Sequence, residues 1–168
     1  MFKNTLLVLG AKSDIGIAVA HKFAREGFDI QLAARNAISL EQECSDIKMR
    51  YNVKTSFHEF NALAFNSHEK FISSLPYLPT VAISTVGYLG TQRTGEKDIK
   101  KIIEIIRINY EGVAGIFEII ANHFEKRGTG TLIGISSVAG DRGKASNYLY
   151  GSAKAGLTCY LSGLRNRL

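Results

Sequence analysis

Tyr150 and Lys154 stand four residues apart near the end of the chain, within a segment of helical pattern. Side chains at this spacing share one face of a helix, so we expect the phenol and the amine to lie together. A free phenol is a poor base at pH 7, and a cation within roughly 4–6 Å favours its ionised form. Ser136 and Ser137 precede the pair and add two hydroxyl groups. Such a set can exchange a proton with the oxygen of a carbonyl or an alcohol.

A glycine-containing turn at residues 10–16 (GAKSDIG) follows the apolar run 6–9 near the start of the chain. Glycines allow such a turn to bring backbone N–H groups close to a pyrophosphate at the N-terminus of the next helix. We expect Asp14 to be the N-cap of that helix and to point away from the phosphate, which stabilises the helix by about 1 kcal/mol. The turn therefore predicts a dinucleotide site.

The residues after the second apolar segment indicate which dinucleotide is bound. An acidic residue at the end of this strand would bind a ribose 2′-hydroxyl, but Ala34 stands there and Arg35 follows it. Lys12, in the glycine turn, should face the same ribose. Two cations without a carboxylate suit a 2′-phosphate, so we predict NADP(H) as the preferred cofactor and NAD(H) as the alternative.

Strand and helix patterns alternate along the whole chain. We expect strands at 6–9, 29–34, 55–60, 80–85 and 131–136, and helices at 15–26, 38–51, 66–74, 98–126 and 147–167. Strands that are apolar on both faces and separated by helices predict a parallel sheet covered on both sides. Right-handed crossovers give a doubly wound, Rossmann-like α/β fold of three layers with strand order 3-2-1-4-5. The carboxyl ends of the strands are where such sheets bind ligands.

The helix expected at 98–126 is apolar on more than one face. One face can pack on the sheet, and the other needs a second subunit or a lid from the same chain. We favour the subunit, as a homodimer or homotetramer formed through helices 98–126 and 147–167. Asn109 interrupts the isoleucines of this helix, where asparagine is a poor helix former. Its side chain either bonds to the backbone at a kink or has a role in the site.

These motifs resemble the short-chain dehydrogenase/reductase family over essentially the whole chain. Segment 9–16 is similar to the T-G-x-x-x-G-x-G loop of that family, with leucine for the threonine and aspartate for the central glycine. Segment 131–140 (TLIGISSVAG) is similar to its fifth strand, and 109–112 (NYEG) to its N-x-x-G motif. The family's serine lies thirteen residues before its tyrosine, which selects Ser137 over Ser136. The resemblance implies four catalytic residues: Asn109, Ser137, Tyr150 and Lys154.

The resemblance also implies further cofactor contacts. Asn61, followed by Ala62, takes the place of an aspartate that touches adenine, and segment 84–87 (STVG) takes the place of N-N-A-G. Asn109 would hold a water that links Lys154 to solvent. The cofactor-binding residues that we expect are Gly10, Lys12, Ser13, Ile15, Gly16, Arg35, Asn61, Ala62, Ser84, Gly87, Tyr150 and Lys154.

The function implied is an NADP(H)-dependent oxidoreductase acting on a small carbonyl or alcohol through a Ser-Tyr-Lys-Asn proton relay. Two alternatives are a nucleotide-sugar or polyprenyl-sugar epimerase or ketoreductase of the same family, and a weakly active NADP-binding regulatory protein. Family members continue past the last helix with further strands. We therefore expect residues 1–168 to form a single NAD(P)-binding Rossmann domain that is C-terminally incomplete.

Composition argues against several other classes of protein. The net charge is +6, but the lysines and arginines are scattered, which disfavours a nucleic-acid partner. The two cysteines are far apart and show no metal-ligand spacing with histidines, so we predict no metal site and reduced thiols. No stretch is long and apolar enough to span a membrane. We expect a cytoplasmic protein.

Overall fold

The strands form one parallel sheet in the order β3-β2-β1-β4-β5, as the alternating pattern predicts. The computed structural model describes residues 4–168. The strands are β1 (Thr5–Leu9), β2 (Asp29–Ala34), β3 (Thr55–Glu59), β4 (Val81–Ser84) and β5 (Thr131–Gly134). All neighbouring pairs are parallel. The order reverses between β1 and β4, so the crevice at their carboxyl ends is the expected ligand site.

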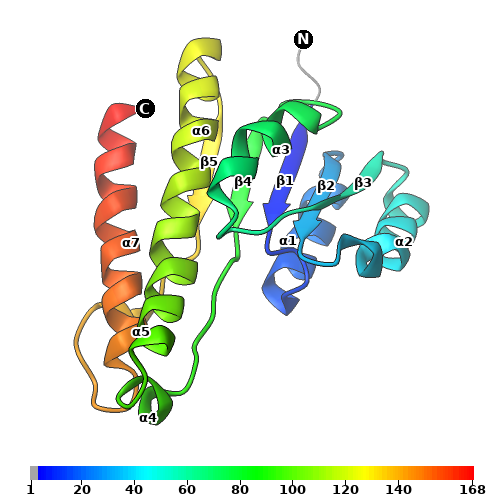
Figure 1. Ribbon diagram of the computed structural model, residues 1–168. Coiled ribbons are helices and arrows are strands. Elements are labelled where there is room, and N and C mark those ends of the chain that lie inside the picture. Colours follow the sequence, from blue (N-terminus) through cyan, green and yellow to red (C-terminus); the bar gives the residue numbers. More distant parts are fainter. Residues whose placement is uncertain (1–3) are drawn as a thin grey trace.

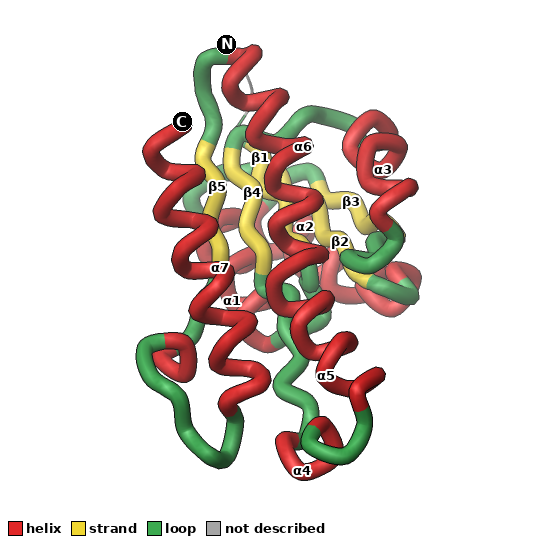
Figure 2. Tube along the Cα trace, turned by 60° about the vertical axis from the view of Figure 1, so that its left-hand side comes forward, coloured by secondary structure: helices red, strands yellow, loops and turns green. Residues whose placement is uncertain are grey.

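Helices cover both faces of this sheet (Figures 1 and 2). One layer consists of α1 (Asp14–Arg25) and α2 (Glu41–Tyr51), and the other of α3 (His68–Ser74), α6 (Gly112–Arg127) and α7 (Tyr148–Arg167). The remaining helical segments are α4 (Gln92–Gly95), α5 (Ile99–Ile106), and the short turns η1 (Ala37–Leu40), η2 (Phe65–Ser67), η3 (Arg107–Glu111) and η4 (Val138–Gly140).

The central strand β1 divides the core in two, because side chains alternate between the faces of a strand. Leu6 and Val8 pack in the cluster under α1 and α2, whereas Leu7 and Leu9 pack in the cluster under α3, α6 and α7. All five residues of β1 are buried. This burial on both faces explains why the strands show as continuous apolar runs and not as alternating patterns.

The long helix expected at 98–126 is not uniformly α-helical. It consists of α5, a π-helical turn (η3) and α6, and Asn109 lies inside the π turn. A π turn inserts a residue into the helix and frees backbone groups locally, so it commonly occurs at functional sites. The segment expected as a helix at 38–51 begins with the 3-10 turn η1, and the short helix α4 was not predicted.

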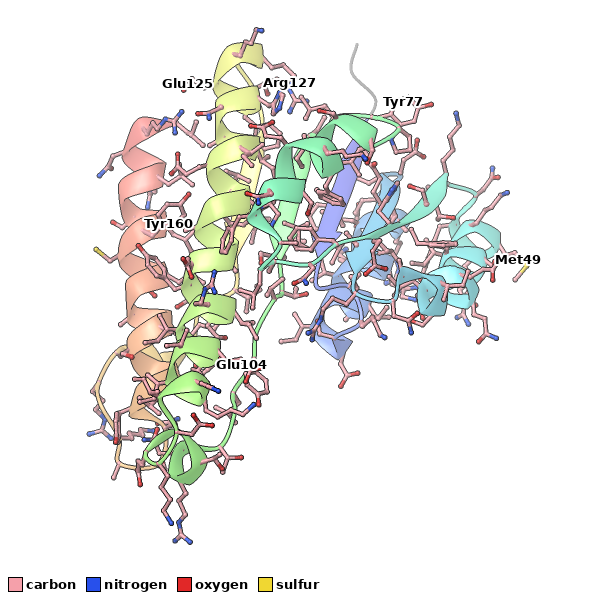
Figure 3. All side chains as sticks on the ribbon, viewed as in Figure 1. Met49, Tyr77, Glu104, Glu125, Arg127 and Tyr160 are labelled. Atoms are coloured by element: carbon pink, nitrogen blue, oxygen red, sulfur yellow. The ribbon has the colours of Figure 1, made fainter. Side chains whose placement is uncertain are left out.

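The α5–η3–α6 rod and α7 lie side by side and extend past the carboxyl ends of the strands, where α4 also lies (Figure 1). Tyr160 of α7 lies in the seam with α6 (Figure 3), where its hydroxyl donates to Glu118 Oε1 at 2.9 Å. Arg167 of α7 donates to Glu118 and to Glu125 of α6, at 2.8 and 2.6 Å. These contacts fix α7, which carries Lys154, against α6, which continues directly from the π turn that holds Asn109. Within residues 4–168, no helix has the length and apolar character to cross a membrane.

Candidate cofactor and active site

The turn after β1 is built around Gly10, which has a φ of +82°. A Cβ at this position would lie 2.8 Å from the backbone nitrogen of Val86, so any other residue would be both strained and crowded. The N–H groups of Gly10 and Ala11 both donate to Ala33 O, which ties the turn to the end of β2. The turn therefore lies directly between β2 and β4, at the reversal of strand order.

Ser13, and not Asp14, is the N-cap of α1. The Ser13 hydroxyl oxygen accepts the N–H of Gly16 at 3.0 Å and donates to Thr85 Oγ1 at 3.0 Å, while Asp14 is the first helical residue and is exposed. The prediction for Asp14 as the cap was wrong, because the extended backbone of Ser13 places its shorter side chain within reach of the Gly16 N–H.

A cleft of about 510 Å³ opens beside this turn. It runs from the turn after β1, past the ends of β2 and β3, to the segment after β4. Its volume lies in the range of pockets that bind small molecules and cofactors, roughly 300–1,000 Å³. The lining residues are Gly10, Lys12, Ser13, Ala34, Arg35, Asn36, Phe60, Asn61, Ala62, Leu63, Thr85, Val86, Gly87, Tyr88 and Ile108.

Most of the predicted cofactor residues line this cleft, but five do not: Ile15, Gly16, Ser84, Tyr150 and Lys154. Ile15 is exposed outside it, and the N–H of Gly16 is used by the Ser13 cap. Ser84 is buried at the end of β4, where its oxygen accepts the N–H of Val86. The neighbouring Thr85, which sequence reasoning did not single out, lines the cleft instead and donates to Leu9 O and Gly10 O.

Asn61 and Ala62 lie where β3 ends and form the far wall of the cleft. Asn61 Oδ1 accepts the N–H of Leu63 at 3.0 Å, so this oxygen is used inside the loop. Nε2 of the buried His68 lies 3.2 Å from the Asn61 carbonyl oxygen, and this hydrogen bond holds the loop after β3. Burial lowers the pKa of His68, which favours the neutral ring at this position.

Lys154 and Tyr150 lie on the same side of α7, as their spacing predicts. Lys154 Nζ stands 5.8 Å from the centre of the Tyr150 ring. The lysine is only 2% exposed, and its amine donates to Ile135 O at 2.9 Å. Burial lowers the pKa of Lys154, because desolvation disfavours the charged amine. Tyr150 is half-buried and lies outside the residues that line the cleft.

Asn109 clamps the segment that leaves β4. Its Oδ1 accepts the N–H of Tyr88 at 3.0 Å, and its Nδ2 donates to Tyr88 O at 2.7 Å and to Ile105 O at 2.8 Å. The side chain is fully buried. The side chain of Asn109 therefore bonds to backbone groups at a helix irregularity, which is the first of the two alternatives for this residue. These bonds also affect the site. The amide holds Gly87 and Tyr88, which line the cleft.

The two serines after β5 make different contacts. Ser136 Oγ donates to Lys154 O at 3.1 Å and pairs with Thr158, so it joins the end of β5 to α7. Ser137 caps η4 by accepting the N–H of Ala139 at 3.1 Å, which leaves its hydroxyl hydrogen for another acceptor. This difference favours Ser137 over Ser136 as the serine that meets a ligand.

Two glycines let η4 approach α7 closely. A Cβ on Gly151 would clash with Ala139 O, and a Cβ on Gly140 would lie 2.8 Å from the Ala155 nitrogen. Small residues at both positions therefore let η4, which directly follows Ser137, pack against α7 at residues 151–155.

Gly87 connects the cleft to the Tyr–Lys pair. A Cβ built on this glycine would lie 3.5 Å from Asn109 Oδ1 and 3.9 Å from Lys154 Nζ. Gly87 itself lines the cleft. The buried amine of Lys154 therefore stands just behind the last residues of the cleft, and the two ends of the predicted site meet there.

His21, Glu43 and Asp46 gather between α1 and α2, away from the cleft. Their ligand-type atoms lie within 4.8 Å of one another. His21 Nε2 is 2.6 Å from Glu43 Oε1, and Arg50 donates to Asp46 at 2.7 Å. Because these hydrogen bonds already engage the side chains, the cluster acts as a polar link between two helices.

Comparison with known proteins agrees with this geometry. The chain matches the short chain dehydrogenase family over residues 4–168. It is 32% identical over 166 residues to an uncharacterized oxidoreductase of Mycobacterium tuberculosis, covering 97% of this chain and 66% of the relative. The chain thus spans slightly less than two thirds of that protein's length.

Solved structures show the same fold. A short-chain dehydrogenase from Sphingobium yanoikuyae in complex with NADPH superposes with a TM-score of 0.89 and 24% identity, covering 98% of this chain and 65% of that one. A 3-oxoacyl-[acyl-carrier protein] reductase from Brucella melitensis in complex with NAD gives a TM-score of 0.89 and 20% identity, covering 100% of this chain and 69% of that one.

Proposed function

Because the chain belongs to the short-chain dehydrogenase family, we propose that it is part of an NADP(H)-dependent oxidoreductase that interconverts a carbonyl and an alcohol. One observation carries this proposal. The cleft that begins at the glycine turn ends at Gly87, and the buried amine of Lys154 stands 3.9 Å from a Cβ built there. A dinucleotide along the cleft would bring its reactive end to the Tyr–Lys pair.

The residues of the cleft fit a dinucleotide. Gly10 leaves space that a Cβ would fill, and the first turn of α1 directs N–H groups toward an anion beside it. Asn61 has its oxygen used by Leu63, so its amide nitrogen is the group that could donate to an adenine edge. Bound NADP(H) supplies or accepts the hydride.

The preference for NADP(H) rests on Lys12 and Arg35. Both are exposed, both line the cleft, and neither has an ion-pair partner among residues 4–168. Two free cations at the ribose end suit a 2′-phosphate. The Sphingobium relative was solved with NADPH and the Brucella relative with NAD, so the choice depends on side chains at this end and not on the fold. Arg35→Ala should weaken NADPH binding and leave NADH binding nearly unchanged.

The other residues divide the acid–base work. Tyr150 gives its phenolic proton to the carbonyl oxygen during reduction and takes it back during oxidation. Lys154 places its buried amine 5.8 Å from the centre of the Tyr150 ring, beside the group that transfers the proton. Ser137 donates its free hydroxyl hydrogen to the same oxygen and stabilises the charge that develops there. Asn109 holds the Gly87–Tyr88 segment in place, so we assign it as a positioning residue.

Turnover by Tyr150→Phe tests the proposal. We expect NADPH oxidation with a panel of ketones to fall by at least about a hundredfold, because general acid catalysis contributes typically 10²–10⁴-fold, while the Kd for NADPH stays within about twofold of wild type. Tyr148→Phe is the matched control, since Tyr148 is exposed and has no lysine four residues on. An active Tyr150→Phe protein would refute the assignment.

We also propose that the protein assembles with copies of itself through α5, η3 and α7. Ile99, Ile103, Ile106 and Tyr110 are exposed along one stripe of the rod at helical spacing. Ile99 alone is 66% exposed. A contiguous apolar stripe of this kind, beside α7, is best covered by the same stripe of a second subunit.

A further inference from the structure

Glu59 is the last residue of β3 and was not singled out from the sequence. Strand register sets it beside Ala34, one residue before Arg35. Its carboxylate reaches the turn that follows β2, where Oε1 accepts the N–H of Asn36 at 3.0 Å and Oε2 accepts the N–H of Ala37 at 2.9 Å. The exposed acid of one strand thus bonds, with both oxygens, to the backbone beyond the neighbouring strand.

The turn that Glu59 holds has an unusual backbone. Asn36 adopts the left-handed conformation, with φ 55° and ψ 58°, and the 3-10 turn η1 starts directly after it. Successive N–H groups that converge in such a turn form a concave site for an anion. In this protein that anion is the Glu59 carboxylate, which satisfies both donors and stabilises a left-handed conformation that is uncommon outside glycine, although asparagine tolerates it better than most residues.

This arrangement decides what a ligand meets at that end of the cleft. Arg35 and Asn36 of the same turn line the cleft, and so does Lys12. Because Glu59 uses the backbone donors of Asn36 and Ala37, a 2′-phosphate cannot rely on those N–H groups. It must be read by the side chains of Lys12 and Arg35, which the turn has to hold in place.

We propose that Glu59 is a positioning residue for cofactor selection, which fixes the left-handed turn at Asn36 so that Arg35 is presented to a 2′-phosphate. The inference rests on the proposed NADP(H) function and names a further determinant of it. Two backbone donors bond to the Glu59 carboxylate, but they carry no net charge, so its negative charge still opposes a nearby 2′-phosphate. The effect of Glu59 on NADPH binding is therefore the balance of positioning against repulsion, and the proposal requires that positioning be the larger.

The test is to measure the Kd values of NADPH and NADH, by fluorescence titration or calorimetry, for wild type and two variants. Glu59→Ala removes both bonds, and we expect about five- to tenfold weaker NADPH binding. This loss corresponds to the contribution of roughly one solvent-exposed, charge-assisted hydrogen bond. Glu59→Gln keeps the shape and one acceptor, so we expect about two- to fourfold weaker NADPH binding. NADH binding should change by less than about twofold in both, since NADH has no 2′-phosphate for Arg35 to bind.

Glu41→Gln is the matched control, because Glu41 is an exposed acid just after η1 whose carboxylate makes no hydrogen bond or ion pair within residues 4–168. It should leave the NADPH-to-NADH ratio of Kd values unchanged. Tighter NADPH binding by Glu59→Gln would mean that charge repulsion dominates and would overturn the proposal. An unchanged ratio in Glu59→Ala would overturn it as well, while leaving the NADP(H) function standing. Failure of wild type to bind either dinucleotide would overturn both.

Discussion

Replacing Asn109 by alanine should remove the clamp between the long helical rod and the segment that leaves β4. Three backbone groups lose their partner in this variant: the N–H and carbonyl of Tyr88, and the carbonyl of Ile105. The Asn109 side chain is fully buried, so water reaches these groups only if the structure opens. The consequence should appear in both stability and ligand binding.

The size of the effect follows from the number of bonds. A hydrogen bond between neutral groups contributes about 1 kcal/mol, and a buried group left without a partner costs about 1–3 kcal/mol. The bond to Ile105 is buried, and the two bonds to Tyr88 are partly buried. At about 1 kcal/mol for each bond, Asn109→Ala should lower the free energy of unfolding by about 3 kcal/mol.

Urea denaturation followed by circular dichroism measures this free energy directly. The control is Asn122→Ala on the same rod, where an exposed amide accepts one bond from Arg167, and we expect a loss of about 0.5 kcal/mol or less. Limited proteolysis should also cut Asn109→Ala faster within residues 87–98. A loss below about 1 kcal/mol with unchanged proteolysis would show that the amide does not hold this segment.

Three further outcomes are expected. Gly10→Ala should destabilise the fold by at least about 1 kcal/mol and abolish NADPH binding, because φ is +82° and the new Cβ would meet the Val86 nitrogen; an unaffected Kd would contradict this. Because burial lowers the pKa of Lys154, the unfolded state binds more protons than the folded state as the pH approaches 10.5. The free energy of unfolding of wild type should therefore rise relative to that of Lys154→Met as the pH rises toward 10.5, measured in paired urea titrations. A difference that does not change with pH would argue against a lowered pKa of Lys154. Ile103→Asp should shift the mass measured by light scattering from oligomer to monomer without loss of helical signal, and an unchanged mass would place the interface elsewhere.

The order of strands and helices could be predicted from the sequence, because the pattern of apolar residues that indicates each element lies within that element. Five apolar runs separated by helical patterns predicted the parallel sheet, and the handedness of crossovers then left one order that the structure confirms. The placing of Tyr150 and Lys154 on one side of α7 follows from the same local geometry, since a spacing of four residues determines a helix face.

Errors arose where two neighbouring residues compete for one position. Ser13 caps α1 in place of Asp14, and Thr85 lines the cleft in place of Ser84. In both cases the types of residue were suitable for the expected role. The difference of one position depends on backbone angles and on which side of a strand end faces the crevice, and neither is encoded in residue type.

The sequence by itself determined which groups are available and which elements carry them: a glycine turn, two cations near a strand end, and a phenol one helical turn from an amine. Only the tertiary structure decided how distant segments meet, because contacts across twenty or more residues depend on strand register and helix packing. Register brings Glu59 to the N–H groups of Asn36 and Ala37. Packing of the rod on α7 brings the Asn109 amide and the Lys154 amine to Gly87. Such meetings leave no periodic signal in the chain, since they are fixed by the shape of the folded sheet.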